Sequence, residues 1–231
     1  MPDALEPYLA STNETPPRRL GQRYGPGGFL PEPGNTIVCH LDQNDPTHLA
    51  VIDARKALQS LPGAEALLFT PIDSLHMTVF EGVIDTRRTY DAWPLGVDAS
   101  ASIDDMTALL SERLQNCPTP PNIRMRLSRV APSGLQLEGA TPDDDKALRQ
   151  WRDALTKIFG YRHKGHNHYR FHMTFAYPLD WLPDHLAPQW RDALAEIGDT
   201  LQRAAPIIPL HAPAFCTFPD MTRFDPVLRL G

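Results

Sequence analysis

The tripeptide His-Met-Thr occurs twice in this 231-residue chain, each time inside a short apolar run. The first copy lies in residues 75–79 (LHMTV) and the second in residues 171–175 (FHMTF). Both runs are predicted to be strands, and residues i and i+2 of a strand point to the same face. Each copy therefore presents one imidazole and one hydroxyl side by side on a stiff element, while its methionine faces the core.

Two imidazoles and two hydroxyls are sufficient for acid–base chemistry on a phosphodiester. Because imidazole titrates near neutral pH, His76 and His172 can hold different protonation states at one pH. One would take a proton from an attacking water and the other would protonate the leaving oxygen, in an order that the sequence leaves open. The hydroxyls of Thr78 and Thr174 would donate hydrogen bonds to the phosphoryl oxygens. The scheme needs no metal or cofactor, and it suits a cyclic phosphodiester, whose ring strain and built-in leaving group reduce what the protein must supply.

The composition is that of an ordinary globular chain, with 42% hydrophobic residues, 22% charged residues and a net charge of −6. The acidic balance argues against tight binding to duplex nucleic acid, because such binding depends on many lysine and arginine contacts with phosphates. It is compatible with a small phosphodiester, a nucleotide or an RNA end as substrate. Three scattered cysteines indicate neither a disulfide framework nor a thiolate zinc site. No apolar run is long enough to cross a membrane, so we expect a cytoplasmic monomer with no membrane partner.

The order of predicted elements indicates an α+β fold with antiparallel sheets flanked by helices. Residues 1–34 are rich in proline and glycine and are predicted to form an irregular arm. Residues 35–231 are predicted to form a single bilobal domain, in which each half of the chain builds one lobe. Hydrophobic periodicity predicts strands near residues 35–41, 66–69, 123–130, 135–138 and 210–218. Helix start signals occur at Asp45-Pro46, Ser102 and Thr141, and another helix covers residues 186–201. Two pseudo-symmetric lobes would bring the two His-Met-Thr strands together across a central cleft.

Two H-x-T motifs on strands of two such lobes resemble the 2H phosphoesterase superfamily. The superfamily includes RNA 2′,3′-cyclic phosphodiesterases, RNA 2′-5′ ligases and cyclic nucleotide phosphodiesterases. The resemblance implies the bilobal α+β fold and catalytic roles for His76, Thr78, His172 and Thr174. It covers residues 35–220 in element order, and its specific match is confined to the two motifs. The chain resembles an uncharacterised branch, so the resemblance does not imply a particular substrate.

Several residues outside the motifs are candidates for substrate contact. Positive side chains near either motif could form a rim for an anionic substrate. Aromatic side chains could stack on a nucleobase, and one further histidine could approach His76 from the neighbouring strand. The candidates for substrate contact are Arg88, Arg170, Tyr24, Trp93 and His40, and Arg87, Lys164 and His168 are further members of the rim. Tyr177 is predicted to be a core residue, because it shares a strand face with Phe175.

Two other functions remain open at this point. Four histidines lie close together at positions 163, 166, 168 and 172, and clustered histidines can bind zinc in a metal-dependent hydrolase. However, no His-Glu-x-x-His pattern surrounds them, and an exposed polar loop is the simpler interpretation. A non-catalytic module that binds a phosphorylated ligand in the same cleft is the second alternative. Two histidines favour catalysis over binding, because binding alone needs only hydrogen-bond donors.

Overall fold

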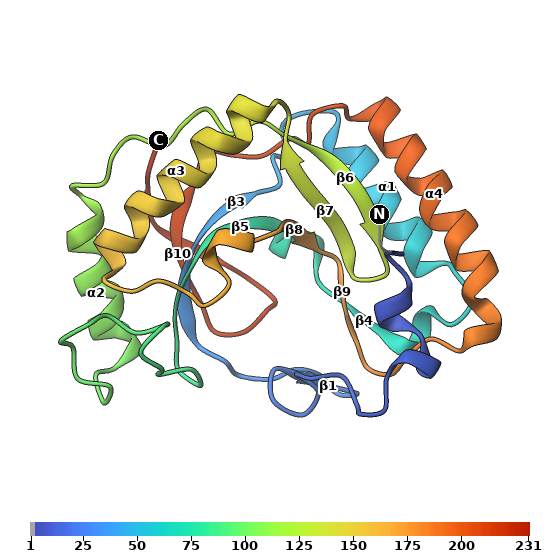
Figure 1. Cartoon of the computed structure of the whole chain (residues 1–231), viewed down its shortest axis with the longest axis horizontal. Coiled ribbons are helices and arrows are strands. Elements are labelled where there is room, and N and C mark those ends of the chain that lie inside the picture. The colour runs from blue at the N-terminus through green and yellow to red at the C-terminus, as the bar shows by residue number, and fades with distance from the viewer. Residues whose placement is uncertain (1–2) are drawn as a thin grey trace.

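A seven-stranded antiparallel sheet forms the centre of the computed structural model, which describes residues 3–231 (Figure 1). The strand order is β11-β10-β3-β5-β8-β7-β6. The bounds are β3 (Gly34–His40), β5 (His76–Ile84), β6 (Met125–Ala131), β7 (Gly134–Gly139), β8 (Phe171–Thr174), β10 (Ala214–Phe218) and β11 (Asp225–Arg229). A two-stranded sheet pairs β4 (Leu67–Phe69) with β9 (Ala176–Pro178). The predicted α+β class with antiparallel sheets is confirmed.

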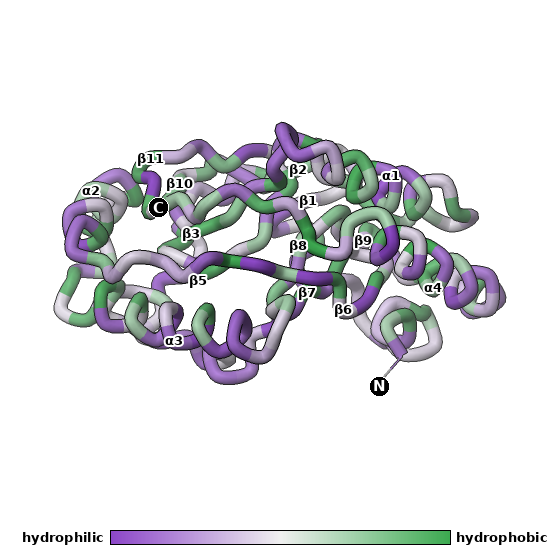
Figure 2. Tube along the Cα trace, turned by 90° about the horizontal axis from the view of Figure 1, so that it is seen from above, coloured by the Kyte–Doolittle hydropathy of each residue, from purple (hydrophilic) through white to green (hydrophobic). Residues whose placement is uncertain are grey.

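The four α-helices of residues 3–231 lie in two pairs, which Figure 1 shows on opposite sides of the molecule. Their bounds are α1 (His48–Gln59), α2 (Ile103–Leu114), α3 (Pro142–Phe159) and α4 (Ala187–Ala204). Helix α1 packs against α4, and α2 packs against α3. Each pair therefore takes one helix from each half of the chain, which corrects the expectation that each half builds its own lobe. Seen from above, the two helix pairs flank the strands, and their tubes alternate between hydrophilic and hydrophobic residues (Figure 2).

The helices begin where side chains satisfy the free backbone N–H groups of the first turn. The Ser102 hydroxyl accepts a hydrogen bond from the Asp105 N–H at the start of α2. Thr141 and Asp144 form a reciprocal capping box at the start of α3. Both starts were predicted from the sequence. Helix α1 begins later than predicted, because the Asp45 carboxylate accepts hydrogen bonds from the N–H and hydroxyl of Thr47 in the turn before it.

The two halves of the chain meet in the sheet at two places, where β3 pairs with β10 and where β5 pairs with β8. Met77 lies opposite Met173, and both side chains are fully buried in the main core. Strand β5 also pairs with β3 over most of its length, and β8 pairs with β7 at four positions. Because side chains alternate along a strand, burial of the two methionines turns the histidine and threonine of each motif to the opposite face.

The N-terminal segment has more regular structure than the sequence led us to expect. It contains two 3₁₀ turns (Glu6–Tyr8 and Ala10–Thr12) and a small hairpin of β1 (Tyr24–Gly25) and β2 (Gly28–Phe29). Leu5 and other apolar side chains of this segment belong to the hydrophobic core. In Figure 1 the segment, drawn in blue, runs along the open side of the molecule between the two helix pairs. No helix in residues 3–231 is long and apolar enough to cross a membrane.

Candidate active site

The four motif side chains line one cavity of about 100 Å³, which we call the catalytic pocket. The antiparallel pairing of Met77 with Met173 sets their arrangement. One step along each strand places His76 opposite Thr174, and one step the other way places Thr78 opposite His172. Each imidazole therefore lies across from the hydroxyl of the other motif.

The same hydrogen bond orients both imidazoles. His76 Nδ1 lies 2.6 Å from the carbonyl oxygen of Ser74, and His172 Nδ1 lies 2.9 Å from that of Arg170. A carbonyl oxygen can only accept, so Nδ1 carries the proton in each neutral ring and Nε2 carries the lone pair. Nε2 is therefore the atom available for proton transfer on both strands.

The surroundings of the two imidazoles differ. The His76 ring packs against the Phe224 ring, with 4.0 Å between centroids, and its neighbour on β3 is His40. Burial lowers the pKa of His76 to about 3, and the charges of His40 and His172 act in the same direction. The His172 side chain is exposed and has the Tyr169 ring 6.1 Å away. His76 is consequently neutral at neutral pH, while His172 is open to solvent.

The two threonine hydroxyls are available to a ligand. Among residues 3–231, neither Thr78 Oγ1 nor Thr174 Oγ1 has a hydrogen-bond partner. Two other polar residues of the pocket are occupied by the protein itself. The Thr36 hydroxyl donates to the Phe80 carbonyl, and the Asn35 amide bridges Thr107 and the Val83 N–H. The free donors of the pocket therefore coincide with the motif threonines.

An apolar wall closes the pocket beside His76. Phe218, Met221 and Phe224, from β10 and the loop that follows it, line this side. His40 Nε2 lies 3.0 Å from the carbonyl oxygen of Phe224, so the imidazole donates a hydrogen bond that holds this loop. His40 was predicted to contact substrate, but it does not line the pocket. Its place in the structure is that of a positioning residue for Phe224.

Sequence reasoning did not place five polar residues at this pocket, namely Arg23, Asn35, Thr36, Glu81 and Tyr177. Arg23 forms an ion pair with the buried Glu32 at 2.5 Å and a hydrogen bond with Tyr177. Burial raises the pKa of the Tyr177 hydroxyl. Tyr177 was predicted to face the core, but β8 ends at Thr174 and the next two residues are both buried, so the alternation does not continue. Arg23 lies in the N-terminal arm, where no periodic pattern marks it.

The remaining predicted contact residues lie in three places. Tyr24 is buried behind Tyr177, with 5.0 Å between ring centroids. Arg170 borders a small cavity that also contacts His172 and Thr174.

Arg88 and Trp93 lie outside the catalytic pocket and contact each other. The Arg88 guanidinium lies over the Trp93 ring at 4.6 Å, and it donates hydrogen bonds to the carbonyl oxygens of Ala99 and Ala101. It also forms an ion pair with Asp85. The two residues therefore hold the loop before α2 together, which corrects their expected place at the substrate.

The histidines from position 163 to 172 do not converge. His163 bonds to the Glu81 carbonyl oxygen, the buried His166 bonds to the Asp153 carboxylate, and His172 faces the catalytic pocket. In the part of the chain that the structure describes, no group of three or more His, Cys, Asp or Glu side chains is placed to hold a metal ion. The expected exposed loop is also corrected, because His166 is buried.

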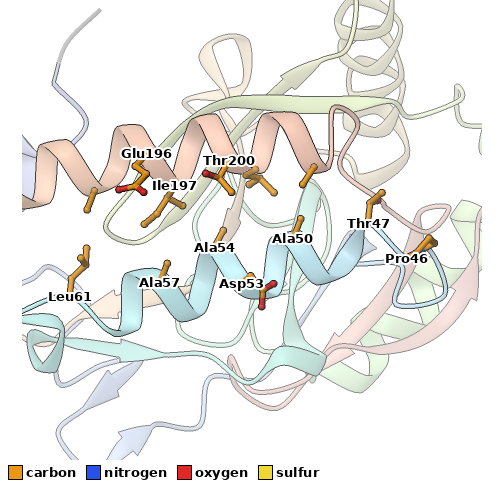
Figure 3. A pocket seen from close by; sticks show the side chains of 13 residues that line it. Pro46, Thr47, Ala50, Asp53, Ala54, Ala57, Leu61, Glu196, Ile197 and Thr200 are labelled. Atoms are coloured by element: carbon orange, nitrogen blue, oxygen red, sulfur yellow. The ribbon is translucent and has the colours of Figure 1, made fainter.

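A cavity of about 710 Å³, larger than the catalytic pocket, lies between α1 and α4 (Figure 3). Small side chains such as Ala50, Ala54 and Ala57 line it on α1, and Ile197 and Thr200 lie across from them on α4. None of the motif residues borders this groove. The titratable side chains that line it are the carboxylates of Asp53 and Glu196, and neither histidine of the duplicated motif is near them, so the size of a cavity does not locate the paired imidazoles.

Comparison with known proteins gives a family for the chain and a similar solved structure. Residues 24–136, which include the first H-x-T motif, match a family described as 2H-phosphodiest, domain of unknown function DUF1868. The chain belongs to this 2H phosphodiesterase-like family. Its structure is similar to the crystal structure of ATU0111, a conserved protein of unknown function from Agrobacterium tumefaciens str. C58. The two share 40% sequence identity with a TM-score of 0.97, and the match covers 100% of both chains. No curated protein matches the chain.

Proposed function

We propose that this protein is a metal-independent phosphoesterase that hydrolyses a cyclic phosphodiester, such as a 2′,3′-cyclic nucleotide, an RNA end or a related small cyclic phosphate. One observation carries the proposal. Two imidazoles on paired strands are each fixed through Nδ1 by a backbone carbonyl, and both line one pocket with two free hydroxyls. This is the set of groups that proton transfer on both sides of a phosphate requires.

His76 is the general base of this reaction. Its burial keeps the ring neutral, and Nε2 takes a proton from water as the water oxygen bonds to phosphorus. The endocyclic P–O bond breaks at the same centre. His172, which solvent can reach, acts in its imidazolium form: Nε2 takes up a proton from solvent before the reaction and gives it to the departing oxygen, while Nδ1 keeps its proton hydrogen-bonded to the Arg170 carbonyl oxygen. The product is a phosphomonoester with a free hydroxyl, and exchange with solvent restores both histidines.

The other groups of the pocket bind the phosphate. Thr78 and Thr174 donate hydrogen bonds to the non-bridging oxygens, whose negative charge grows in the transition state. Arg23, whose charge is paired with Glu32, lines the same cavity from the N-terminal arm and can offer a further N–H donor. The apolar wall of Phe218, Met221 and Phe224 limits the access of water near His76. We further propose that the protein acts in the cytoplasm as a monomer.

Turnover of 2′,3′-cyclic nucleotides by wild type, His76→Ala and His172→Ala, with and without a chelator, tests the proposal. We expect each variant to lose a factor of about 10² to 10⁴ in kcat, and the chelator to have no effect. His168→Ala is a matched control, because this exposed histidine lies outside the pocket. A substrate that both alanine variants turn over at the wild-type rate would contradict the assignment. Binding of the cyclic nucleotide without product would favour the non-catalytic module instead.

A further inference from the structure

A second, larger cavity of about 610 Å³ adjoins the catalytic pocket, and we call it the basic pocket. Five cationic side chains and two carboxylates line it, in a chain whose net charge is −6. The cations come from separate parts of the sequence. Arg18, Arg19, Arg87, Arg152 and Lys164 come from the N-terminal arm, the segment after β5, helix α3 and the loop before β8. The fold therefore brings five cationic side chains together in one cavity, although the chain as a whole has a negative net charge.

The carboxylates of the basic pocket already have partners. Glu81 forms an ion pair with Arg87 at 2.7 Å, and Asp91 accepts a hydrogen bond from the Thr89 hydroxyl. Arg19 lies 3.7 Å from the buried Glu32 outside this pocket. Three cations are left against the one carboxylate, Asp91, that has no cationic partner, and within residues 3–231 no carboxylate lies within ion-pair distance of Arg18, Arg152 or Lys164. The pocket therefore has excess positive charge that an anionic group would neutralise.

Arg152 shows that the excess charge is built into the fold. The residue is only 2% exposed, and a guanidinium at such a position is costly without partners. It donates one hydrogen bond to the Val79 carbonyl oxygen of β5 and lies 4.0 Å over the Tyr169 ring. These contacts fix the guanidinium at the wall of the basic pocket without neutralising its charge.

The two pockets share a wall. Glu81 and Tyr169 line both of them, and the Tyr169 hydroxyl reaches the Thr78 carbonyl oxygen at 3.4 Å. Thr78 and Glu81 are three residues apart on β5. Because a strand rises about 3.3 Å per residue, Glu81 at the wall of the basic pocket lies about 10 Å along the strand from Thr78. One ligand of nucleotide size can reach from one pocket to the other.

We propose that the basic pocket binds a second phosphate group of the same substrate, so that the substrate is a small nucleotide-like cyclic phosphodiester that also carries a monophosphate or diphosphate. This inference rests on the proposed function. Positive charge confined to a cavity of this size fits a small ligand, whereas a long nucleic acid would require a basic surface that a chain of net charge −6 lacks.

The first test compares two 2′,3′-cyclic nucleotides that differ only in a 5′-phosphate. We expect wild type to have a kcat/KM about tenfold or more higher for the 5′-phosphorylated compound, as one or two charge-assisted contacts provide. The double variant Arg18→Ala/Lys164→Ala should lose this preference, and both residues are exposed, so the variant is expected to fold. Lys157→Ala, an exposed lysine of α3 outside the pocket, is the matched control and should keep the preference. Equal kcat/KM for the two compounds in wild type would overturn the proposal.

The second test is independent of turnover and uses inorganic pyrophosphate in a calorimetric titration. We expect binding to wild type and to His172→Ala, and binding at least about tenfold weaker to Arg18→Ala/Lys164→Ala. Loss of binding in His172→Ala with retention in the double variant would place pyrophosphate in the catalytic pocket and overturn the proposal, and so would no binding to wild type. If pyrophosphate behaves as expected but no cyclic phosphodiester is turned over, the basic pocket stands and the proposed function fails.

Discussion

The two His-Met-Thr strands have the same sequence and the same backbone hydrogen bond to the histidine, yet they lie in different surroundings. Strand β5 is nine residues long and pairs on both sides, and its His76 is packed under Phe224. Strand β8 has four residues, and its His172 is exposed. The difference shows how a duplicated motif can supply unlike groups, because the environment of each imidazole sets its proton affinity.

The largest expected effect separates the roles of the two histidines through the leaving group. On a 2′,3′-cyclic nucleotide both His76→Ala and His172→Ala should lose a factor of about 10² to 10⁴. On a nitrophenyl phosphodiester the leaving group needs no proton, so the loss in His172→Ala should shrink to about tenfold or less while that in His76→Ala persists. The measurement is kcat for both substrates. Equal losses in His172→Ala on the two substrates would reverse or remove the assignment of His172 as the acid.

The threonines are expected to behave more alike than the histidines. Thr78→Val and Thr174→Val each remove one hydrogen bond to a charged oxygen, which should lower kcat/KM by roughly 10- to 100-fold. Steady-state kinetics with the cyclic nucleotide measure this. Thr200→Val, in the groove between α1 and α4, is a control that should not change the rate. An effect confined to one motif threonine would contradict the equivalent roles that the strand register implies for Thr78 and Thr174.

The burial of His76 predicts a pH dependence of stability. Its pKa falls from 6.5 to about 3 on folding. The unfolded state therefore binds more protons in this window, and the free energy of unfolding decreases as the pH falls from 6.5 towards 3. One such group contributes a slope of up to about 1.4 kcal/mol per pH unit. Denaturant titrations of wild type and His76→Gln should show a flatter dependence for the variant below pH 6.5 and parallel curves above pH 7.5. Parallel curves throughout would mean that His76 is not buried as described.

The smallest expected effect on activity concerns the arginine that lies outside the pocket. Arg88→Ala should leave kcat/KM within about twofold of wild type, because its side chain contacts Trp93 and backbone carbonyls and does not reach the pocket. It should lower the free energy of unfolding by about 1 to 2 kcal/mol, through lost hydrogen bonds and the lost cation–π contact. Thermal unfolding with the kinetic assay checks both. A large loss of activity without loss of stability would indicate that Arg88 contacts the substrate, as the sequence predicted.

The sequence predicted well the strands and helix starts that depend on neighbouring residues. Alternation of apolar residues placed His76 and His172 on strands, and capping residues placed the starts of α2 and α3, because these signals depend only on neighbours in the chain. The pairing of α1 with α4 was not predicted, since it depends on how the two halves interleave. Arg23 was missed because its place at the pocket depends on how the N-terminal arm packs, and no periodic pattern marks it.

The sequence also did not predict the environment of each motif. Identical tripeptides gave no sign that Phe224, about 150 residues further along the chain, would pack on one imidazole and leave the other exposed. Tyr177 was placed in the core because the strand alternation was carried past its end at Thr174. The surroundings of the two histidines and the position of Tyr177 therefore depend on long-range packing, which local sequence patterns do not predict.

A crystal structure with a nucleoside 2′-monophosphate, one of the two phosphomonoesters that opening of a 2′,3′-cyclic phosphate can give, tests the central claim most directly. We predict that the phosphate lies between the two strands, within hydrogen-bond distance of Nε2 of both His76 and His172 and of both threonine hydroxyls. A phosphate bound elsewhere, or bound to one motif alone, would contradict paired acid–base catalysis in this pocket.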